Sequence, residues 1–167
     1  MRSVPIFIAL GSNLGDSVAI LRAAVEGLGE EIRVDKVSTF VRSAPMYVTD
    51  QSPFVNGVLS GETTLGPMAL LAFLKQVEAV FGRQARVRNG PRELDLDIVA
   101  YGALQLRSGL LQVPHPRLAE RRFVLQPLAE IAPEVRLPGL PSVLSMLAAT
   151  EDQALSVQPI SDAALSI

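Results

Sequence analysis

The chain has 167 residues, of which 49% are hydrophobic and 19% charged, and its formal net charge at pH 7 is −2. This composition is typical of one globular domain and excludes an intrinsically disordered chain. The absence of cysteine excludes disulfides, thiolate metal sites and a cysteine nucleophile, and is compatible with a reducing compartment, so we expect a cytoplasmic protein. We expect no membrane span and no secretory signal, because no apolar run approaches ~20 residues and the N-terminal run is short.

The N-terminal part of the chain predicts one strand and one helix. The apolar run over residues 4–10 favours a strand. Residues 17–28 carry apolar side chains at helical spacing, with Asp16 as a candidate N-cap and Gly29 as the end of the helix.

Two further strand-like segments follow, separated by a polar loop with two prolines over residues 42–53. Residues 32–41 alternate apolar and polar side chains at first, which predicts a strand. Residues 54–64 resume strand character, although the Asn56-Gly57 pair by itself is a signal for a tight hairpin turn.

A second helix and a fourth strand complete the pattern. Residues 66–82 show helical spacing, with Pro67 at the start and Gly82 at the end. A loop over residues 83–93 leads to a strand over 94–101. The order strand, helix, strand, strand, helix, strand predicts an α+β fold: a ferredoxin-like core with a four-stranded antiparallel sheet and both helices on one face.

The C-terminal third adds smaller elements to this core. We expect a short hairpin over residues 103–113 and a last helix near 141–149. No repeat or linker interrupts the chain, so residues 1–150 are predicted to form a single domain. Residues 151–167 are small and of mixed polarity, and we expect them to form a loosely ordered tail.

Two carboxylates stand inside the last predicted strand of the core. Asp95 and Asp97 alternate with apolar residues, so both emerge on the same face of a strand, with Cα atoms roughly 6.6 Å apart. Two unpaired anions beside a core would cost several kcal/mol each, so cations must neutralise them. These cations are either metal ions or the guanidinium groups of Arg88 or Arg92.

The charge around this pair is unevenly distributed along the chain. Residues 82–122 hold eight arginines and four acidic residues, a balance of +4, whereas the rest of the chain has 7 basic and 13 acidic residues, a balance of −6. A basic segment around an acidic pair suits a compact polyanion bridged by metal ions. The alternative is a set of arginines on a solvated face.

Four stretches of the sequence occur together in the order found in one enzyme family. They are "IALGSNLGD" (8–16), "SAPMYVTDQSPFVNG" (43–57), "FGR…RNGPRELDLDIVAYG" (81–102) and "VPHPRLAERRFVLQPLAEIAP" (113–133). Together they closely resemble 6-hydroxymethyl-7,8-dihydropterin pyrophosphokinase of folate biosynthesis. The resemblance implies a ferredoxin-like fold and transfer of the diphosphoryl group of ATP to the pterin hydroxymethyl group, with release of AMP. One departure is Asn89, where several members of the family carry tryptophan.

The resemblance implies roles for individual residues at the acidic pair. Asp95 and Asp97 match aspartates that hold two Mg²⁺ ions bridging the ATP phosphates, and Mg²⁺ takes hard oxygen ligands and keeps several waters. Arginines that match Arg83, Arg92 and Arg121 contact ATP or assist transfer, and guanidinium groups fit phosphate oxygens. The residues implied in catalysis are Arg83, Arg92, Asp95 and Asp97; those implied in ATP binding are Glu78, Arg83, Arg86, Arg92, Ile98, His115 and Arg121.

Alternatives stay open for several of these residues. Any single arginine also fits a solvated surface position, and Arg86 lies in a loop that is one residue shorter than in well-known members. Glu78 also fits an exposed helix face. His115 is the only histidine, and a lone histidine is more often structural, although its position between two prolines favours a fixed side chain.

The resemblance also implies a pterin pocket. Two aromatic rings, Phe54 and Phe123, would sandwich the flat ligand, and the Asn56 amide would read its donor and acceptor edge from a strand rather than a hairpin turn. Core packing is the alternative for both rings. The residues implied in pterin binding are Gly11, Ser43, Ala44, Met46, Phe54, Asn56 and Phe123.

Two other classes of function compete with this interpretation. Ferredoxin-like sheets also build RNA-recognition domains, but these need aromatic residues on central strands, and only 5% of this chain is aromatic. A two-metal phosphoesterase would use the same carboxylates without a pterin acceptor. We expect a monomer that takes ATP and the pterin as substrates and has neither a nucleic-acid nor a membrane partner.

Overall fold

The computed structural model describes residues 2–44, 52–81 and 93–160. The predictions made for Met46, Arg83, Arg86 and Arg92 concern residues outside these ranges. In chain order the elements are β1 (Val4–Ser12), α1 (Ser17–Leu28), β2 (Ile32–Val37), β3 (Val41–Ser43), β4 (Phe54–Thr63), α2 (Pro67–Val80), β5 (Asp95–Tyr101), β6 (Leu106–Arg107), β7 (Gln112–Val113), η1 (Leu118–Glu120), α3 (Arg122–Ile131), α4 (Val143–Ala149), η2 (Glu151–Ser156) and β8 (Val157–Pro159), where η1 and η2 are 3-10 helices.

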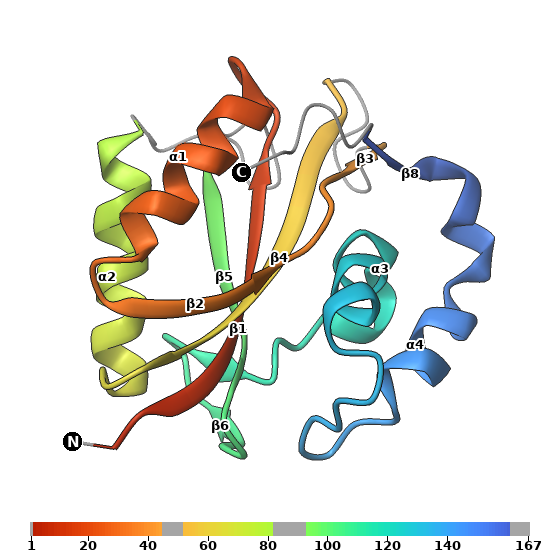
Figure 1. Cartoon of the computed structure of the whole chain (residues 1–167). Helices are drawn as coiled ribbons and strands as arrows, with labels where there is room; N and C mark the ends of the chain where they lie inside the picture. Colours follow the sequence, from red (N-terminus) through yellow and green to blue (C-terminus); the bar gives the residue numbers. More distant parts are fainter. Residues whose placement is uncertain (1, 45–51, 82–92, 161–167) are drawn as a thin grey trace.

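The strands form one antiparallel sheet and a small separate hairpin of β6 and β7 (Figure 1). The order in the six-stranded sheet is β5-β1-β4-β3-β8, and β2 also pairs with β4. Every pairing within it is antiparallel. The predicted α+β class with an antiparallel sheet is therefore confirmed.

The sheet has six strands rather than the predicted four, because the segment over residues 32–41 is divided into β2 and β3 and because β8 joins the edge. Ser38 interrupts the ladder: its N–H donates to the Val58 carbonyl at 2.9 Å, and its hydroxyl accepts from the Val58 N–H at 3.0 Å. The next N–H, of Thr39, donates to both carboxylate oxygens of Glu130 on α3, each at 3.1 Å. These contacts bend the chain at the point where α3 packs against the sheet.

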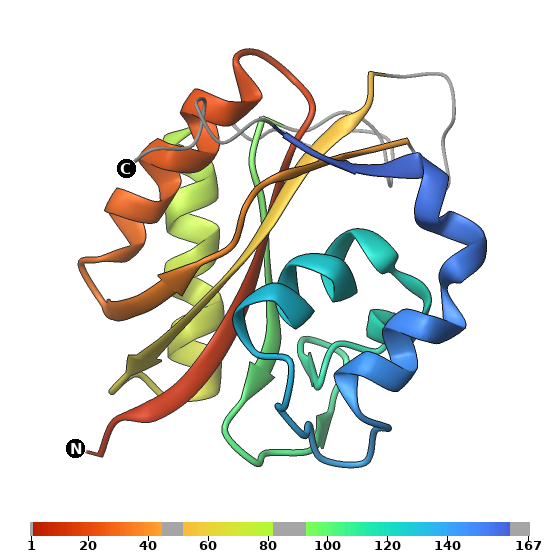
Figure 2. The ribbon, with the colours of Figure 1, turned by 45° about the vertical axis from the view of Figure 1, so that its right-hand side comes forward.

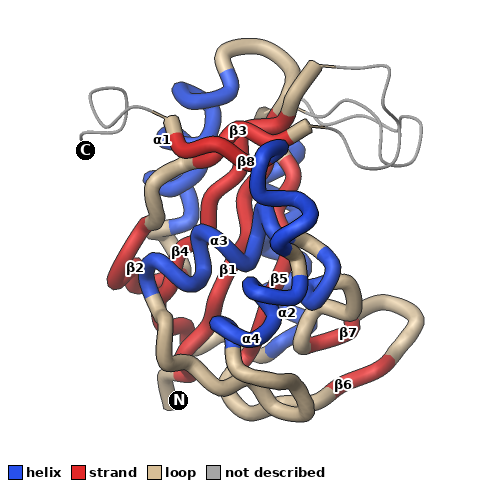
Figure 3. Tube along the Cα trace, turned by 90° about the vertical axis from the view of Figure 1, so that its right-hand side faces the viewer, coloured by secondary structure: helices blue, strands red, loops and turns tan. Residues whose placement is uncertain are grey.

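Helices cover both faces of the sheet, although the prediction assigned a face only to the two core helices. α1 and α2 lie on one face, as expected, and α3 and α4 lie on the other (Figures 1 and 3). Ile8, Leu10 and Leu59 belong to the hydrophobic core beneath α1 and α2. Val58 and Val99 belong to a second core beneath α3 and α4. The period of two along each strand sends alternate side chains to the two layers.

Local signals placed most of the predicted element boundaries correctly. The Asp16 side chain accepts from the Ala19 N–H at 3.3 Å and caps α1, and Gly29 ends that helix. Pro67 is the first residue of α2. The hairpin signal at Asn56-Gly57 is overruled, since both residues lie within β4.

The C-terminal segment forms more structure than the predicted loose tail. Residues 151–159 build η2 and β8, and β8 pairs with β3 at the edge of the sheet (Figure 2). Val157 anchors this strand, because its side chain is only 4% exposed. No helix in the described ranges is long and apolar enough to cross a membrane.

Candidate functional site

The acidic pair lies on the sheet face that α3 covers, in line with other predicted site residues. Residues that pair across neighbouring strands share a face. Asp97 of β5 pairs with Ala9 of β1, and Asp95 pairs with Gly11. Gly11 pairs on its other side with Asn56 of β4. The predicted metal and pterin residues are thus brought into one row across three strands.

The second carboxylate of the pair, Asp97, lies in an environment that disfavours its charge. Burial and the neighbouring Asp95 carboxylate raise the pKa of Asp97 to about 7, against the opposing charge of Arg121. The Asp97 side chain is nevertheless 42% exposed, so it lies at an opening rather than deep in the core. A site with two anions and an open side is suited to a cation.

The donor set fits a hard cation that keeps part of its water shell. Within residues 2–44, 52–81 and 93–160, no group of three or more histidine, aspartate or glutamate side chains could hold a metal ion by itself. Mg²⁺ characteristically binds through one or two carboxylates together with substrate phosphates. Asp95 and Asp97 match that requirement, whereas a zinc site would need more protein ligands.

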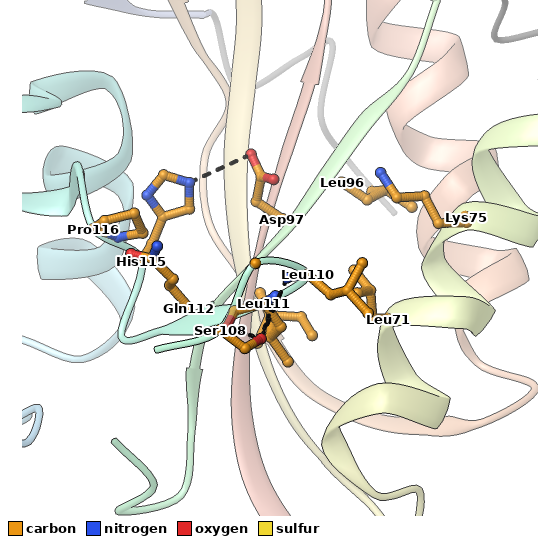
Figure 4. A pocket seen from close by; sticks show the side chains of 12 residues that line it. Leu71, Lys75, Leu96, Asp97, Ser108, Leu110, Leu111, Gln112, His115 and Pro116 are labelled. Atoms are coloured by element: carbon orange, nitrogen blue, oxygen red, sulfur yellow. Dashed lines mark hydrogen bonds and ion pairs between the residues drawn. The ribbon is translucent and has the colours of Figure 1, made fainter. Parts of the chain in front are cut away.

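His115 is held beside the pair by its own backbone. Its N–H donates to the Val99 carbonyl at 2.9 Å, and its Nδ1 accepts from the Arg117 N–H at 3.1 Å. Nε2 points toward Asp97 and lies 4.0 Å from Oδ2, which is beyond hydrogen-bond distance (Figure 4). Burial and the charge of Arg121 lower the pKa of His115 to about 4. The imidazole is therefore neutral at pH 7 with its proton on Nε2, as a donor directed at the acidic site.

A cavity of about 290 Å³ opens beside the acidic pair at the edge of β5. Leu71 and Lys75 of α2 line one side, and Leu110 and Leu111 of the β6–β7 hairpin line another (Figure 4). Ile98, Asp97 and His115 also line it. A cavity that combines apolar side chains with a cation and a neutral donor suits a ligand with a flat base and an anionic chain.

Glu78 has a structural partner that its sequence position did not indicate. Its side chain is only 2% exposed, and Oε2 accepts from the Leu96 N–H at 2.7 Å. Because β5 is at the edge of the sheet, its outward N–H groups need acceptors from elsewhere. Oε1 lies 3.8 Å from Lys75 Nζ, so Glu78 also offsets the charge of a lysine that lines the cavity. Nucleotide contact by Glu78 stays a prediction.

Arg121 is a further cationic side chain close to Asp97. It lines a small hollow together with Ala9, Asp97 and His115. Its guanidinium carbon lies 5.7 Å from the centre of the Phe123 ring, a favourable cation–π distance. Phe123 itself is half-buried and packs against the core beneath α3.

Asn56 is fixed in place by its neighbours. It is 5% exposed, and its Nδ2 donates to Ser43 Oγ at 2.7 Å. A Cβ on Gly11 would lie 3.0 Å from Asn56 Oδ1, so glycine at that position makes room for the amide. The Ala44 N–H donates to the Ser156 carbonyl at 3.1 Å, and the implied contact of Ala44 with the pterin stays a prediction. Phe54, at the start of β4, is half-buried and pairs with Ser43 across the strands.

An antiparallel sheet between two helical layers, with an acidic pair beside a cavity of mixed polarity, defines an α+β protein with a candidate enzyme site at the edge of β5. Comparison with known families gives the particular type. The family described as 7,8-dihydro-6-hydroxymethylpterin-pyrophosphokinase (HPPK) matches residues 7–133. The chain belongs to this family and is accordingly an ATP-dependent pyrophosphokinase.

Relatives of similar length support this assignment. The 2-amino-4-hydroxy-6-hydroxymethyldihydropteridine pyrophosphokinase of Aquifex aeolicus is 41% identical over 133 residues, covering 80% of this chain and 83% of the relative. The enzyme of the same name from Bacillus subtilis is 44% identical over 131 residues, covering 77% and 78%.

A solved structure of Plasmodium falciparum HPPK-DHPS with pteroate shares the fold. Its TM-score is 0.76 at 12% identity, and the match covers 95% of this chain and 47% of that one. This chain thus spans about half the length of the solved bifunctional protein.

Several residues of the site carried no usable signal in the sequence. Leu71 and Lys75 are one helical turn apart on α2, a spacing equally typical of a solvated face. Leu110 and Leu111 lie in a short hairpin with no recognisable motif. They reach the site only because the hairpin packs beside β5.

Proposed function

We propose that this enzyme transfers the diphosphoryl group of ATP to 6-hydroxymethyl-7,8-dihydropterin and releases AMP. The observation that carries the proposal is the row formed by Asp95, Gly11 and Asn56 across β5, β1 and β4. This row joins an acidic site beside a cavity of about 290 Å³ to a buried amide that suits a pterin. We also infer that β1, α1, β2–β3, β4, α2 and β5 form the ferredoxin-like core that the sequence predicts.

ATP would occupy the cavity at the β5 edge. Leu71, Leu111 and Ile98 offer apolar contacts to the base. The His115 Nε2–H and the Lys75 ammonium would donate to phosphate oxygens, since both groups line the same cavity as Asp97. Arg121, which shares a small hollow with Asp97 and His115, would also bind phosphate. Arg83, Arg86 and Arg92 are further candidate phosphate contacts from the sequence.

Asp95 and Asp97 would hold the two Mg²⁺ ions that the family resemblance implies. When bound, Mg²⁺ neutralises phosphate charge and favours attack on phosphorus. The protein's own contribution is to keep both carboxylates on one face of a strand, with the cationic side chains of Lys75 and Arg121 nearby. Binding of a cation would also return the pKa of Asp97 toward its ordinary range, because the charge that burial disfavours would then be compensated.

The pterin would bind across the ends of β1, β4 and β3. Asn56, held by Ser43, would read the pterin's donor and acceptor edge. Phe54 and Phe123 would stack on its two faces. The Gly11 backbone and the loop containing Ala44 and Met46 would complete the pocket and place the hydroxymethyl oxygen toward Asp95.

The names of relatives support a role in folate biosynthesis. The relatives from Pisum sativum and Arabidopsis thaliana are named folate synthesis bifunctional proteins. We propose that this chain performs the pyrophosphokinase step as a monomer in the cytoplasm. A phosphoesterase using the same carboxylates would hydrolyse nucleotides without an acceptor.

A product assay separates the two activities. The purified chain is incubated with ATP and Mg²⁺, with and without 6-hydroxymethyl-7,8-dihydropterin, and nucleotides and pterins are resolved by chromatography. We expect AMP and pterin diphosphate in equal amounts, and only when the pterin is present. Release of ADP, or of AMP without pterin, would contradict the proposal.

A further inference from the structure

Helix α3 begins without the side-chain acceptor that helix N-termini usually have. Its N-cap residue is Arg121, which makes no capping hydrogen bond, and a guanidinium offers only donors. Serine, threonine, aspartate or asparagine at this position would bind the first N–H groups of the helix and stabilise it. The position instead carries a cation that faces Asp97 and His115.

Gln153 of η2 supplies the acceptor from 31 positions further along the chain. Its Oε1 accepts from the N–H of Arg122, the first residue of α3, at 3.2 Å. Its Nε2 donates to the carbonyl of Glu120 at 2.8 Å. One side-chain amide thus holds the backbone on both sides of Arg121.

The backbone around Gln153 is itself held by a second set of contacts. The Gln153 N–H donates to the Thr150 carbonyl at 2.9 Å, and the hydroxyl of the buried Thr150 donates to the Leu147 carbonyl at 2.9 Å. Arg122 Nη1 donates to the same Leu147 carbonyl at 3.0 Å. The end of α4, the η2 turn and the start of α3 therefore form one connected unit.

We propose that Gln153 is a positioning residue for Arg121. By fixing the peptide groups at residues 120 and 122, it fixes the φ and ψ angles of Arg121 and so the direction in which its side chain leaves the backbone. The proposal rests on the proposed function, in which Arg121 contacts the phosphates of ATP. A guanidinium–phosphate contact depends on orientation, so a small rotation of this backbone would misplace the charge.

The test compares Gln153→Ala with Gln158→Ala, Arg121→Ala and the double variant Arg121→Ala/Gln153→Ala. Gln158 is a matched control because it is an exposed glutamine whose Nε2 donates only locally, to the Leu155 carbonyl at 3.0 Å. Thermal unfolding curves identify an assay temperature at which every variant is folded. If Gln153→Ala does not fold, Gln153→Glu replaces it, since it keeps the acceptor for Arg122 and loses the donor to Glu120.

We expect Gln153→Ala to lower kcat/KM for ATP about tenfold, as loss of two supporting hydrogen bonds allows, and Gln158→Ala to leave it within about twofold. In the Arg121→Ala background, the Gln153→Ala change should lower kcat/KM for ATP by less than about twofold, because the residue that Gln153 positions is gone. An equal loss in both backgrounds, or no loss in either, would overturn the proposal and leave Gln153 as a helix cap only.

Failure of the proposed function is a separate result. If the wild-type chain makes no AMP, calorimetry with an unreactive ATP analogue tests the role of Gln153 independently of the proposed activity. Weaker binding by Gln153→Ala than by Gln158→Ala would support the role of Gln153 even then. A wild-type chain that binds no analogue would overturn both.

Discussion

The two faces of the sheet are made from the same strands but differ in what their side chains do. Toward α1 and α2, β1 and β4 present Ile8, Leu10 and Leu59, all fully buried or nearly so. Toward α3, the same strands present Gly11 and Asn56. One face is therefore committed to hydrophobic burial, whereas the other gives up apolar contacts at its open end to hold polar groups.

The difference is sharpest on β5, where consecutive residues serve opposite purposes. Leu96 packs into the core beneath α2, and the next residue, Asp97, is an anion whose pKa burial raises to about 7. Period-two alternation lets a stable strand carry a charged site without interrupting its hydrophobic side. Substitutions on the two faces should therefore affect different quantities.

The largest effect is expected for Asp97→Asn on catalysis. The change keeps the shape of the side chain and removes its charge, so transfer should fall by at least about 10³-fold through the loss of a metal ligand. Turnover at saturating Mg²⁺, ATP and pterin measures this. Asp35→Asn is the control, since Asp35 lies in an exposed ion pair with Arg33 at 3.8 Å, and such pairs contribute little. Near-normal turnover in Asp97→Asn would remove the acidic pair from the site.

Leu59→Ala should have the opposite signature on the opposite face. Leu59 is fully buried at 0% exposure, and truncation of such a residue costs about 2–5 kcal/mol of the free energy of unfolding. Chemical denaturation measures the loss, and kcat is measured well below the melting temperature. We expect kcat per folded molecule to change less than about threefold. A collapse of kcat in the folded variant would mean that the two faces are not separable.

The aromatic rings proposed for the pterin pocket should show a smaller, ligand-selective effect. Phe54→Leu and Phe123→Leu keep most of the apolar volume and lose the flat π face, so pterin binding should weaken about tenfold while ATP binding changes little. Phe73→Leu in the core beneath α2 is the matched control. Calorimetry with each ligand decides the question. Equal losses for pterin and ATP would mean that these rings are core residues.

The smallest effect concerns stability and pH. The pKa of Asp97 is raised in the folded protein from 3.8 to about 7, so between these values the folded state binds more protons than the unfolded state. Wild-type stability therefore falls as pH rises through this window. Asp97→Asn lacks the effect and should be more stable than wild type by about 1 kcal/mol at pH 8 without Mg²⁺, a figure reduced because the side chain is partly exposed.

The pH series supplies its own control. The stability advantage of Asp97→Asn over wild type should be much smaller at pH 4 than at pH 8, because at pH 4 the carboxyl is protonated in the folded state and still about half protonated in the unfolded state. Denaturation curves at both pH values measure it. A difference that is the same at pH 4 and pH 8 would show that the Asp97 carboxyl is not held in an unfavourable environment.

Local patterns predicted most of the fold and the centre of the site. Alternation in residues 94–101 placed Asp95 and Asp97 on one strand face, and Asp16, Gly29 and Pro67 marked helix ends because capping depends on neighbouring residues. The strand position of Asn56 came from the family resemblance rather than from the local pattern, which favoured a turn. That residues 1–150 form a single domain stays a prediction.

The features that the sequence did not predict depend on contacts between distant parts of the chain. The division of β2 from β3 involves Glu130, which binds a residue 91 positions away. β8 contains Pro159 and is short, so its pairing with β3 had no local signature. Gln153 resembles any polar residue in a tail until α3 is seen beside it. No periodicity or motif encodes such contacts, because each depends on two segments meeting.

One paired measurement tests the separation of the two faces most directly. Wild type, Asp97→Asn and Leu59→Ala are each assayed at pH 8 for the free energy of unfolding without ligand and for formation of AMP and pterin diphosphate with Mg²⁺. We expect Asp97→Asn to be at least as stable as wild type and to form almost no product. Leu59→Ala should be less stable by about 2–5 kcal/mol and should form product at a near-normal rate per folded molecule. Stability and turnover falling together in both variants would contradict the division of the sheet into a structural face and a catalytic face.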